Sequence, residues 1–265
     1  MSNPQNSQHE NQQEKELAGR AAAQLVHDGD VVGLGTGSTA YFAVVALGQR
    51  VKTGLEIVGI PTSIATEELA RKLGIPLTTL DHHTEIDITI DGADEVDPQL
   101  HLIKGGGGAL LREKVVASVT KKMVVVADST KAVAFLGKFP LPVEIIPFAR
   151  AVVEKKLKTL GADPKLRLKS DGQPFVTDNG NYILDASFGK ITDPPAIARV
   201  LSNTPGVVEH GLFIGFAKLA ILGKGSSVVE LRAKTKARHP TKTPAKRKRA
   251  SRILTKRRPS KRSRS

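Results

Sequence analysis

The sequence predicts an α/β fold with a Rossmann-like, open and mostly parallel sheet. Short runs rich in Val, such as "DVVGLGTG" at 30–37 and "MVVVADST" at 123–130, alternate with longer helical stretches. Strands that are apolar almost throughout and separated by helices are typical of a parallel sheet with both faces covered. We therefore expect a strand that enters a glycine turn at 30–37, a strand at 55–63, a strand that runs into a loop at 85–97 and a strand at 123–130. Helices are expected at 38–51, 65–74 and 108–122.

From about Pro142 the pattern changes to that of a smaller α+β domain. The order strand, helix, two strands, helix and strand is typical of an inserted split βαβ, ferredoxin-like unit. The "NG" pair at Asn179 and Gly180 indicates a hairpin between its two middle strands. We expect these elements at 143–149, 150–161, 165–170, 175–188, 193–206 and 207–214, after which 218–223 and 227–231 rejoin the main sheet or its edge.

Charge is distributed unevenly and marks a separate C-terminal segment. Of the 40 Lys and Arg residues, 16 lie in residues 232–265, which contain no Asp or Glu, so the rest of the chain has 24 basic against 26 acidic residues. The segment is rich in Pro, Ser and Thr and cannot bury enough apolar surface to fold alone. We expect a disordered basic tail that either contacts nucleic acid non-specifically or is a solvated extension without function.

Four parts are therefore expected. They are a disordered lead at 1–13, a Rossmann-like catalytic domain at 14–141 and 212–231, a small α+β domain at 142–211 and the tail at 232–265. The absence of cysteine excludes disulfides, thiolate metal sites and cysteine nucleophiles. The polar first twenty residues fit no signal or transit peptide, and no apolar run is long enough to cross a membrane. We expect a soluble, cytoplasmic protein without membrane contact.

Ligands of open parallel sheets bind at the carboxyl ends of the strands, so the loops there are the expected place of the functional residues. The first loop is "GLGTGSTA" at 33–40. Its glycines, Gly37 among them, expose backbone N–H groups to an anion beside a helix N-terminus, and Thr36, Ser38 and Thr39 add hydroxyl donors. The loop predicts a site for a phosphate smaller than that of a dinucleotide. The alternative is a tight turn whose hydroxyls cap the helix.

A second loop, "DGADEVD" at 91–97, is rich in carboxylates. Gly92 lets the chain turn sharply, which can set Asp91 and Asp94 in one pocket. Two close carboxylates repel each other, so one of them can keep its proton and act as an acid. A solvated acidic loop and an oxygen-ligated metal site are the alternatives.

A third loop, "KGGGGALLREK" at 104–114, places four glycines before a helix. Bare backbone can approach a ligand closely, and Lys104 and the first N–H groups of the helix would stabilise an oxyanion there. We expect the helix dipole to keep Glu113 ionised, as a base for removing a proton next to a carbonyl. The alternative is a solvated Glu113 on a charged helix face. In a fourth loop, "ADSTKAV", Lys131 is either a second phosphate ligand or a surface lysine.

Together these segments resemble the type A family of ribose-5-phosphate isomerases. "GLGTGSTA", "DGADE", "KGGGGALLREK" and "LGKFPLPVEIIPFA" look like its signature segments, and "VTDNGNYILD" and "PGVVEHGLF" match its smaller domain, in order from about Glu14 to about Leu231. The resemblance implies interconversion of ribose 5-phosphate and ribulose 5-phosphate in the pentose phosphate pathway, through an enediolate. It also implies no metal, no organic cofactor and a homo-oligomer, which we expect to be a dimer.

The resemblance implies roles for individual residues. By the resemblance Glu113 is the expected proton-transferring base. For the mechanism we further expect Lys104 to stabilise the enediolate and Asp91 or Asp94 to assist ring opening. The residues expected to contact the substrate are Thr36, Gly37, Ser38, Thr39, Asp91, Gly92, Ala93, Asp94, Lys104, Gly105, Gly106, Gly107, Lys131 and Lys15.

A second interpretation places the chain among transcription regulators. A sugar-phosphate-sensing domain of isomerase-like architecture with a nucleic-acid-binding basic tail would also explain the charge distribution. Such a sensor needs the phosphate loop but has no need for a base at Glu113. No helix-turn-helix segment is apparent ahead of the body of the chain either, which favours the isomerase.

Overall fold

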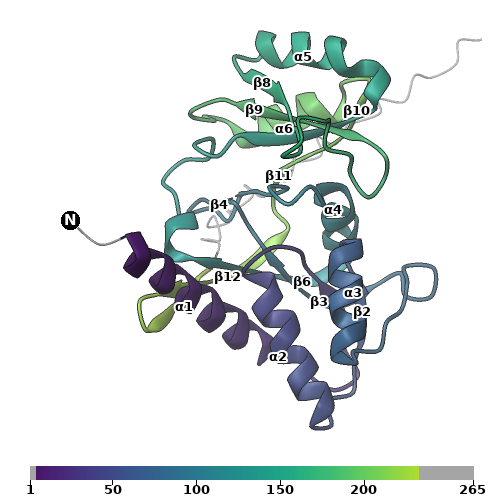
Figure 1. Cartoon of the computed structure of the whole chain (residues 1–265), viewed down its shortest axis with the longest axis vertical. Helices are drawn as coiled ribbons and strands as arrows, with labels where there is room; N and C mark the ends of the chain where they lie inside the picture. Colours follow the sequence, from purple (N-terminus) through teal and green to yellow (C-terminus); the bar gives the residue numbers. More distant parts are fainter. Residues whose placement is uncertain (1–3, 233–265) are drawn as a thin grey trace, which may run out of the picture. The chain divides into compact units, whose positions relative to one another are not determined.

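The computed structural model describes residues 4–232, in which strands and helices alternate as predicted (Figure 1). Except for Arg232, the predicted disordered tail lies outside these residues. None of the helices in the described part combines the length and the apolar character needed to cross a bilayer.

Six strands form the main sheet, in the order β13-β12-β6-β3-β1-β2. They are β1 (Val31–Leu34), β2 (Val58–Pro61), β3 (Ile86–Gly92), β6 (Thr120–Asp128), β12 (Ala217–Lys224) and β13 (Ser227–Leu231). Neighbouring strands are parallel except for β12 and β13, which form an antiparallel hairpin at one edge. The Rossmann-like fold and the return of 218–223 and 227–231 to this sheet are confirmed.

Helices cover both faces of the main sheet. They are α1 (Pro4–Ala23), α2 (Ala40–Lys52), α3 (Ile64–Leu73) and α4 (Leu110–Ser118). Val124 and Val126 of β6 pack into one core with α1, α2 and α3, whereas Met123 and Val125 face the side of α4. This division follows from the alternation of side chains along a strand. The helix expected at 108–122 ends earlier, because residues 120–122 pair with β3.

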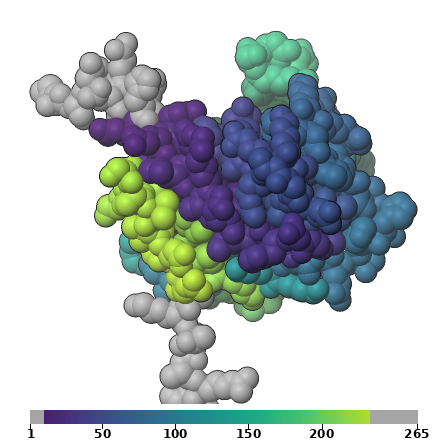
Figure 2. All heavy atoms as spheres, turned by 90° about the horizontal axis from the view of Figure 1, so that it is seen from below, coloured from purple at the N-terminus to yellow at the C-terminus, as the bar shows by residue number. Residues whose placement is uncertain are grey.

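The N-terminal segment is more ordered than predicted. Residues 4–13, expected to belong to a disordered lead, form the first half of α1. The second half is anchored, because α1 contacts α2, β6 and β12, and Figure 2 shows it between α2 and the β12–β13 hairpin. Extending a helix costs far less than nucleating one, so the Gln-rich segment continues the anchored part.

The predicted split βαβ domain follows the first part of the main sheet. Its own sheet has the order β10-β7-β9-β8, with all neighbours antiparallel. Its elements are β7 (Leu141–Ile145), the 3-10 helix η2 (Pro147–Ala149), α5 (Arg150–Thr159), β8 (Asp163–Leu166), β9 (Tyr182–Ser187), α6 (Pro194–Ser202) and β10 (Val207–His210). The turn expected at Asn179 and Gly180 forms in the β8–β9 connection, where Gly180 N donates to Thr177 O at 2.9 Å. The domain limits themselves stay a prediction.

A small third sheet was not predicted. It consists of β4 (Glu95–Val96), β5 (Leu102–Ile103) and β11 (Leu212–Phe213), in the order β11-β5-β4. The strand expected at 207–214 is therefore divided between two sheets at Gly211. Lys104 N donates to Gly211 O at 2.9 Å, and Gly211 N donates to Pro142 O at 2.7 Å. The backbone of Lys104 is thereby fixed at the point where the chain passes from β10 to β11.

The contact between α1 and α2 gives a test of this packing. Replacing glycine by alanine inside an exposed helix usually stabilises a protein by about 0.5–1 kcal/mol. A Cβ at Gly19 of α1 would lie 2.7 Å from Ala43 N and Phe42 Cβ of α2, so α1 would have to move. We expect Gly19→Ala to lower the free energy of unfolding by about 1–2 kcal/mol in denaturant titrations, because overpacking outweighs helix propensity.

The matched control is Gln13→Ala, at an exposed position of the same helix. It should leave the free energy of unfolding unchanged or raise it slightly. A stabilising effect of Gly19→Ala would contradict the close packing of α1 on α2.

Candidate active site

The predicted loops meet where the main sheet reverses its strand order. The chain passes from β1 to β2 on one side, and the sheet extends from β3 on the other side. Ligands of open α/β sheets bind at such a point, outside the carboxyl ends of the strands. The loop after β1 and the end of β3 both lie at this crevice.

A cleft opens there. All four predicted loops contribute to its walls, through residues 36–39, 92–94, 104–107, 113 and 131. Of the residues expected to contact a substrate, only Asp91 and Lys15 are not part of the lining. Asp91 is fully buried against Lys104, whereas Lys15 is a partly buried residue of α1.

Close packing explains why the first loop has a glycine at position 35. A Cβ at Gly35 would overlap with the backbone and carboxylate of Asp91, so a larger residue would separate the two loops. Thr36 N donates to Asp91 Oδ1 at 3.1 Å, and Thr36 Oγ1 lies 2.8 Å from both Thr62 Oγ1 and Ser63 Oγ. Thr62 and Ser63, which sequence reasoning missed, therefore help to hold this loop. Of these two residues, Ser63 has a local signal in the sequence, because a serine directly before a helix is a typical N-cap, and Ser63 is the N-cap of α3.

The alternative role of these hydroxyls as helix caps is not seen at Thr39. This residue is at the N-cap position of α2, but its side chain makes no capping bond, and it lines the cleft. Gly37 has φ +118°, which favours glycine, and Ser38 also lines the cleft. The segment 37–39 is therefore arranged toward a ligand, beside the positive end of the α2 dipole.

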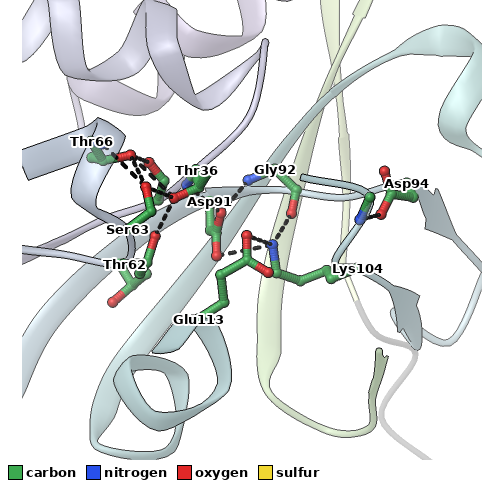
Figure 3. A network of polar contacts seen from close by, with 12 residues as sticks. Thr36, Thr62, Ser63, Thr66, Asp91, Gly92, Asp94, Lys104 and Glu113 are labelled. Carbon is green, nitrogen blue, oxygen red and sulfur yellow. Dashed lines mark hydrogen bonds and ion pairs between the residues drawn. The ribbon is translucent and has the colours of Figure 1, made fainter. Parts of the chain in front are cut away.

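A buried lysine holds two carboxyl groups at the cleft (Figure 3). Lys104 is 2 % exposed, and its Nζ lies 3.0 Å from Asp91 Oδ2, 3.3 Å from Glu113 Oε1 and 2.6 Å from Gly92 O. Burying an ammonium group is costly unless it is paired and hydrogen-bonded, and these oxygens meet that requirement. Asp91 Oδ1 also accepts a bond from Gly92 N at 2.7 Å.

The cluster of Lys104, Asp91 and Glu113 has one cation for two carboxyl groups. Burial raises the pKa of Glu113 to about 8, with Lys104 opposing this shift and Asp91 adding to it. Burial also raises the pKa of Asp91, against Lys104 and two backbone N–H groups. Burial would lower the pKa of Lys104, but Asp91 and Glu113 outweigh it and raise that pKa. Asp91 has the backbone donors and the shorter lysine contact, so Glu113 is the carboxyl that keeps its proton at neutral pH.

This arrangement corrects two expectations about protonation. We expected the helix dipole to keep Glu113 ionised, but Glu113 is 4 % exposed, and loss of solvent outweighs the dipole of a short helix. The turn at Gly92 could also have set Asp91 and Asp94 in one pocket. Asp94 instead accepts a bond from Gly106 N at 2.8 Å, and Figure 3 shows it away from Asp91 and Glu113.

Glu113 is suited to carry a proton to and from a ligand. It lines the cleft, and its Oε2 has no hydrogen-bond partner within the described chain. A carboxyl group whose pKa lies near neutrality can both take and return a proton at working pH. The ammonium group of Lys104 beside it can stabilise negative charge that develops between those two steps.

The four positions of the glycine loop require glycine for different reasons, which are backbone conformation, close packing and open space for a ligand. Gly105 and Gly108 have φ +99° and +85°, in the left-handed region that favours glycine. A Cβ at Gly106 would lie 2.5 Å from Asp94 Oδ1. Gly107 differs, because its Cβ would have only Thr36 Cγ2 nearby, at 3.8 Å. The open space in front of Gly107 is where a ligand can approach the backbone.

Lys131 reaches the cleft from the end of β6. It is the last residue of the 3-10 helix η1 (Ser129–Lys131). Glu14 of α1 accepts bonds from Ser129 N at 2.9 Å, Ser129 Oγ at 2.8 Å and Gly225 N at 2.7 Å, so α1 anchors this loop. Lys15 adjoins the anchor, but its role toward a ligand stays a prediction.

The carboxylates of "DGADEVD" are distributed over different partners. Asp91 faces Lys104 and Asp94 faces Gly106, whereas Asp97 accepts bonds from Gln99 N and His101 N at 2.8 Å. Within residues 4–232, no group of three or more His, Cys, Asp or Glu is placed to hold a metal ion. That the site works without a metal ion stays a prediction.

Comparison with known proteins agrees with this geometry. A family model described as ribose 5-phosphate isomerase A (phosphoriboisomerase A) matches residues 58–227. Ribose-5-phosphate isomerase A of Bradyrhizobium diazoefficiens is 52% identical over 230 residues, which cover 82% of this chain and 95% of that protein. The protein of the same name from Listeria innocua is 49% identical over 218 residues, covering 82% and 97%.

Solved structures give the same result. A D-ribose-5-phosphate isomerase in complex with phospho-erythronic acid has a TM-score of 0.80 and 40% identity, covering 82% of this chain and 97% of that one. Ribose 5-phosphate isomerase A from Methanocaldococcus jannaschii has a TM-score of 0.79 and 42% identity, with the same coverage. The chain belongs to the ribose 5-phosphate isomerase A family.

Proposed function

We infer that this chain is an aldose–ketose isomerase that interconverts ribose 5-phosphate and ribulose 5-phosphate through an enediolate. The observation that carries this inference is the cluster of Lys104, Asp91 and Glu113 at the cleft, where Glu113 has a pKa of about 8. Moving a carbonyl between adjacent carbons requires one group that takes a proton from C2 and returns it to C1. The family of the chain supports the same substrate pair.

The phosphate of the substrate binds the loop 36–39 and Lys131, which line one cleft with the glycine loop. The ionised form of Glu113 takes the proton from C2 of the open-chain aldose. The glycine N–H groups and Lys104 stabilise the enediolate, and Glu113 then delivers the proton to C1. The hydroxyl proton of O2 passes to O1, so that the carbonyl forms at C2. We assign assistance of ring opening to Asp94, because it lines the cleft, whereas Asp91 is fully buried and bonded to Lys104.

The regulator interpretation is less well supported. A sensor would need the phosphate loop but not a carboxyl group whose pKa is tuned toward neutrality beside a buried lysine. The relatives that cover most of the chain are also named isomerases.

Replacing the base tests the inference. Glu113→Gln keeps the shape of the side chain but cannot accept the proton, so we expect kcat for ribose 5-phosphate to fall by roughly 10²- to 10⁴-fold with little change in KM. Glu68→Gln, at an exposed position of α3, serves as the matched control and should keep full turnover. Assays with and without a chelator should agree. Turnover of Glu113→Gln within a few fold of wild type would rule out this mechanism.

We also propose a homodimer in the cytoplasm and non-specific nucleic-acid contact through the basic tail. The tail proposal rests on charge alone, because residues 232–265 carry 16 basic and no acidic side chains. Basic segments bind phosphates by releasing counterions, with little regard for sequence.

Deleting residues 233–265 tests the role of the tail. We expect unchanged isomerase turnover and loss of any binding to duplex DNA. For the full-length chain, the log of the binding constant should fall with log salt at a slope of about −0.9 per phosphate neutralised. Duplex binding retained after deletion would exclude the tail as the binding segment, and lost turnover would mean that the tail supports the active site.

A further inference from the structure

One arginine of the small domain contacts the glycine loop without lining the cleft. Arg167 follows β8 directly, and its Nη1 donates to Gly105 O at 2.9 Å and to Gly106 O at 3.0 Å. Both glycines line the cleft, whereas Arg167 does not. Arg167 therefore contacts the loop from outside the lining of the cleft.

The guanidinium group of Arg167 is itself fixed. Its Nε donates to Asp185 Oδ2 at 2.8 Å, and its Nη2 donates to Asp185 Oδ1. Asp185 belongs to β9, which pairs with β8 in the residues just before Arg167. The side chains are 14 % and 26 % exposed, so this two-bond ion pair is largely shielded from solvent. A planar guanidinium held in this way has a defined orientation and uses its remaining nitrogen for the loop.

These contacts orient two peptide groups of the loop. In a trans peptide, the C=O and N–H groups point in opposite directions. Gly105 O accepts a bond from Arg167, so the N–H of Gly106 in the same peptide group points away from Arg167. This N–H donates to Asp94 Oδ2 at 2.8 Å. Gly106 O also accepts a bond from Arg167, so the N–H of Gly107, which belongs to the same peptide group, likewise points away from Arg167. Gly107 is the position where the loop has open space.

The charge of Arg167 also strengthens the donors that it orients. A cation bonded to a carbonyl oxygen polarises the peptide group, so the N–H of the same peptide becomes a better donor. Phe175 supports the outer side of the loop as well, because a Cβ at Gly108 would lie 2.5 Å from its ring. The guanidinium carbon of Arg167 lies 5.9 Å from the centre of the same ring.

We propose that Arg167 is a positioning residue for the isomerase reaction, which aims the N–H of Gly107 at the enediolate oxygen and the N–H of Gly106 at Asp94. The proposal rests on the function inferred above and adds a role for the small domain. Arg167 acts through the glycine backbone and does not touch the substrate. Its effect is therefore expected in the transition state, where the oxyanion develops, more than in binding of the phosphate.

The test compares Arg167→Met with Arg150→Met. Arg150 is a matched control because it pairs with Glu154 at 2.8 Å in the same domain and makes no bond to the glycine loop. We expect Arg167→Met to lower kcat for ribose 5-phosphate by roughly 10- to 100-fold, somewhat less than the loss of a complete oxyanion donor. KM should change less than about threefold, and Arg167→Lys, which keeps the charge, should recover part of the lost kcat.

Inhibition gives a readout that a general loss of structure would not produce. Phospho-erythronic acid, the ligand of a related isomerase structure, carries a carboxylate at the end of its carbon chain. We expect Arg167→Met to weaken its inhibition about as much as it lowers kcat, and to leave inhibition by inorganic phosphate unchanged. Arg150→Met should change neither inhibition constant.

The outcomes separate this proposal from the inferred function. If wild type turns over ribose 5-phosphate and folded Arg167→Met keeps kcat within twofold, the role of Arg167 is refuted and the function stands. Equal weakening of both inhibitors would also refute it. If wild type and Arg150→Met show no turnover, the inferred function fails instead. Should Arg167→Met not fold, Arg167→Lys and Asp185→Asn decide, and full kcat in both would refute the proposal.

Discussion

The ammonium group of Lys104, buried between Asp91 and Glu113, is the interaction on which the rest of the site depends. Asp91 neutralises this cation and takes two backbone N–H donors besides, so Glu113 lacks sufficient compensation for a second negative charge. Its pKa is raised to about 8, first by burial and then by Asp91. One buried lysine thus faces two carboxyl groups in different surroundings, and environments of this kind separate the pKa values of neighbouring carboxyl groups.

The fold brings these groups together from distant parts of the chain. Asp91 is the last residue but one of β3, Lys104 follows β5, and Glu113 lies in the first turn of α4. The Lys104 backbone is fixed by Gly211, which divides β10 from β11 between two sheets. The small domain therefore contributes to the site without lining the cleft. Arg167 behind the glycine loop belongs to the same arrangement.

Local patterns in the sequence predicted the fold and the loops of the cleft, because each is carried by a short segment. The glycine turns, the acidic loop and the glycine run mark the ends of strands in an open sheet, and topology alone brings them together. The two-residue strands β4, β5 and β11 are too short to show a period. The first half of α1 has no apolar stripe, and only the anchoring of its second half accounts for it.

The remaining features depend on burial and on distant contacts. The sequence showed that Glu113 lies near the N-terminus of a helix, but it did not show the loss of solvent around this side chain. The prediction that the helix dipole keeps Glu113 ionised was therefore wrong. Arg167 lies 61 residues from Gly106, and nothing near it in the sequence indicates that contact. Ser63, as the N-cap of α3, was the one missed residue with a local signal.

The most direct test of this account is an infrared titration of the Glu113 carboxyl group, as a difference between wild type and Glu113→Gln. The C=O stretch of a protonated carboxyl should be present in wild type at neutral pH, disappear with a midpoint near pH 8 and be absent from the variant. Glu113 is protonated below its pKa and ionised above it, so a raised pKa moves the loss of the band upward from the ordinary range near 4.3. A midpoint in that ordinary range, or no difference band at neutral pH, would contradict the central role of the buried cluster.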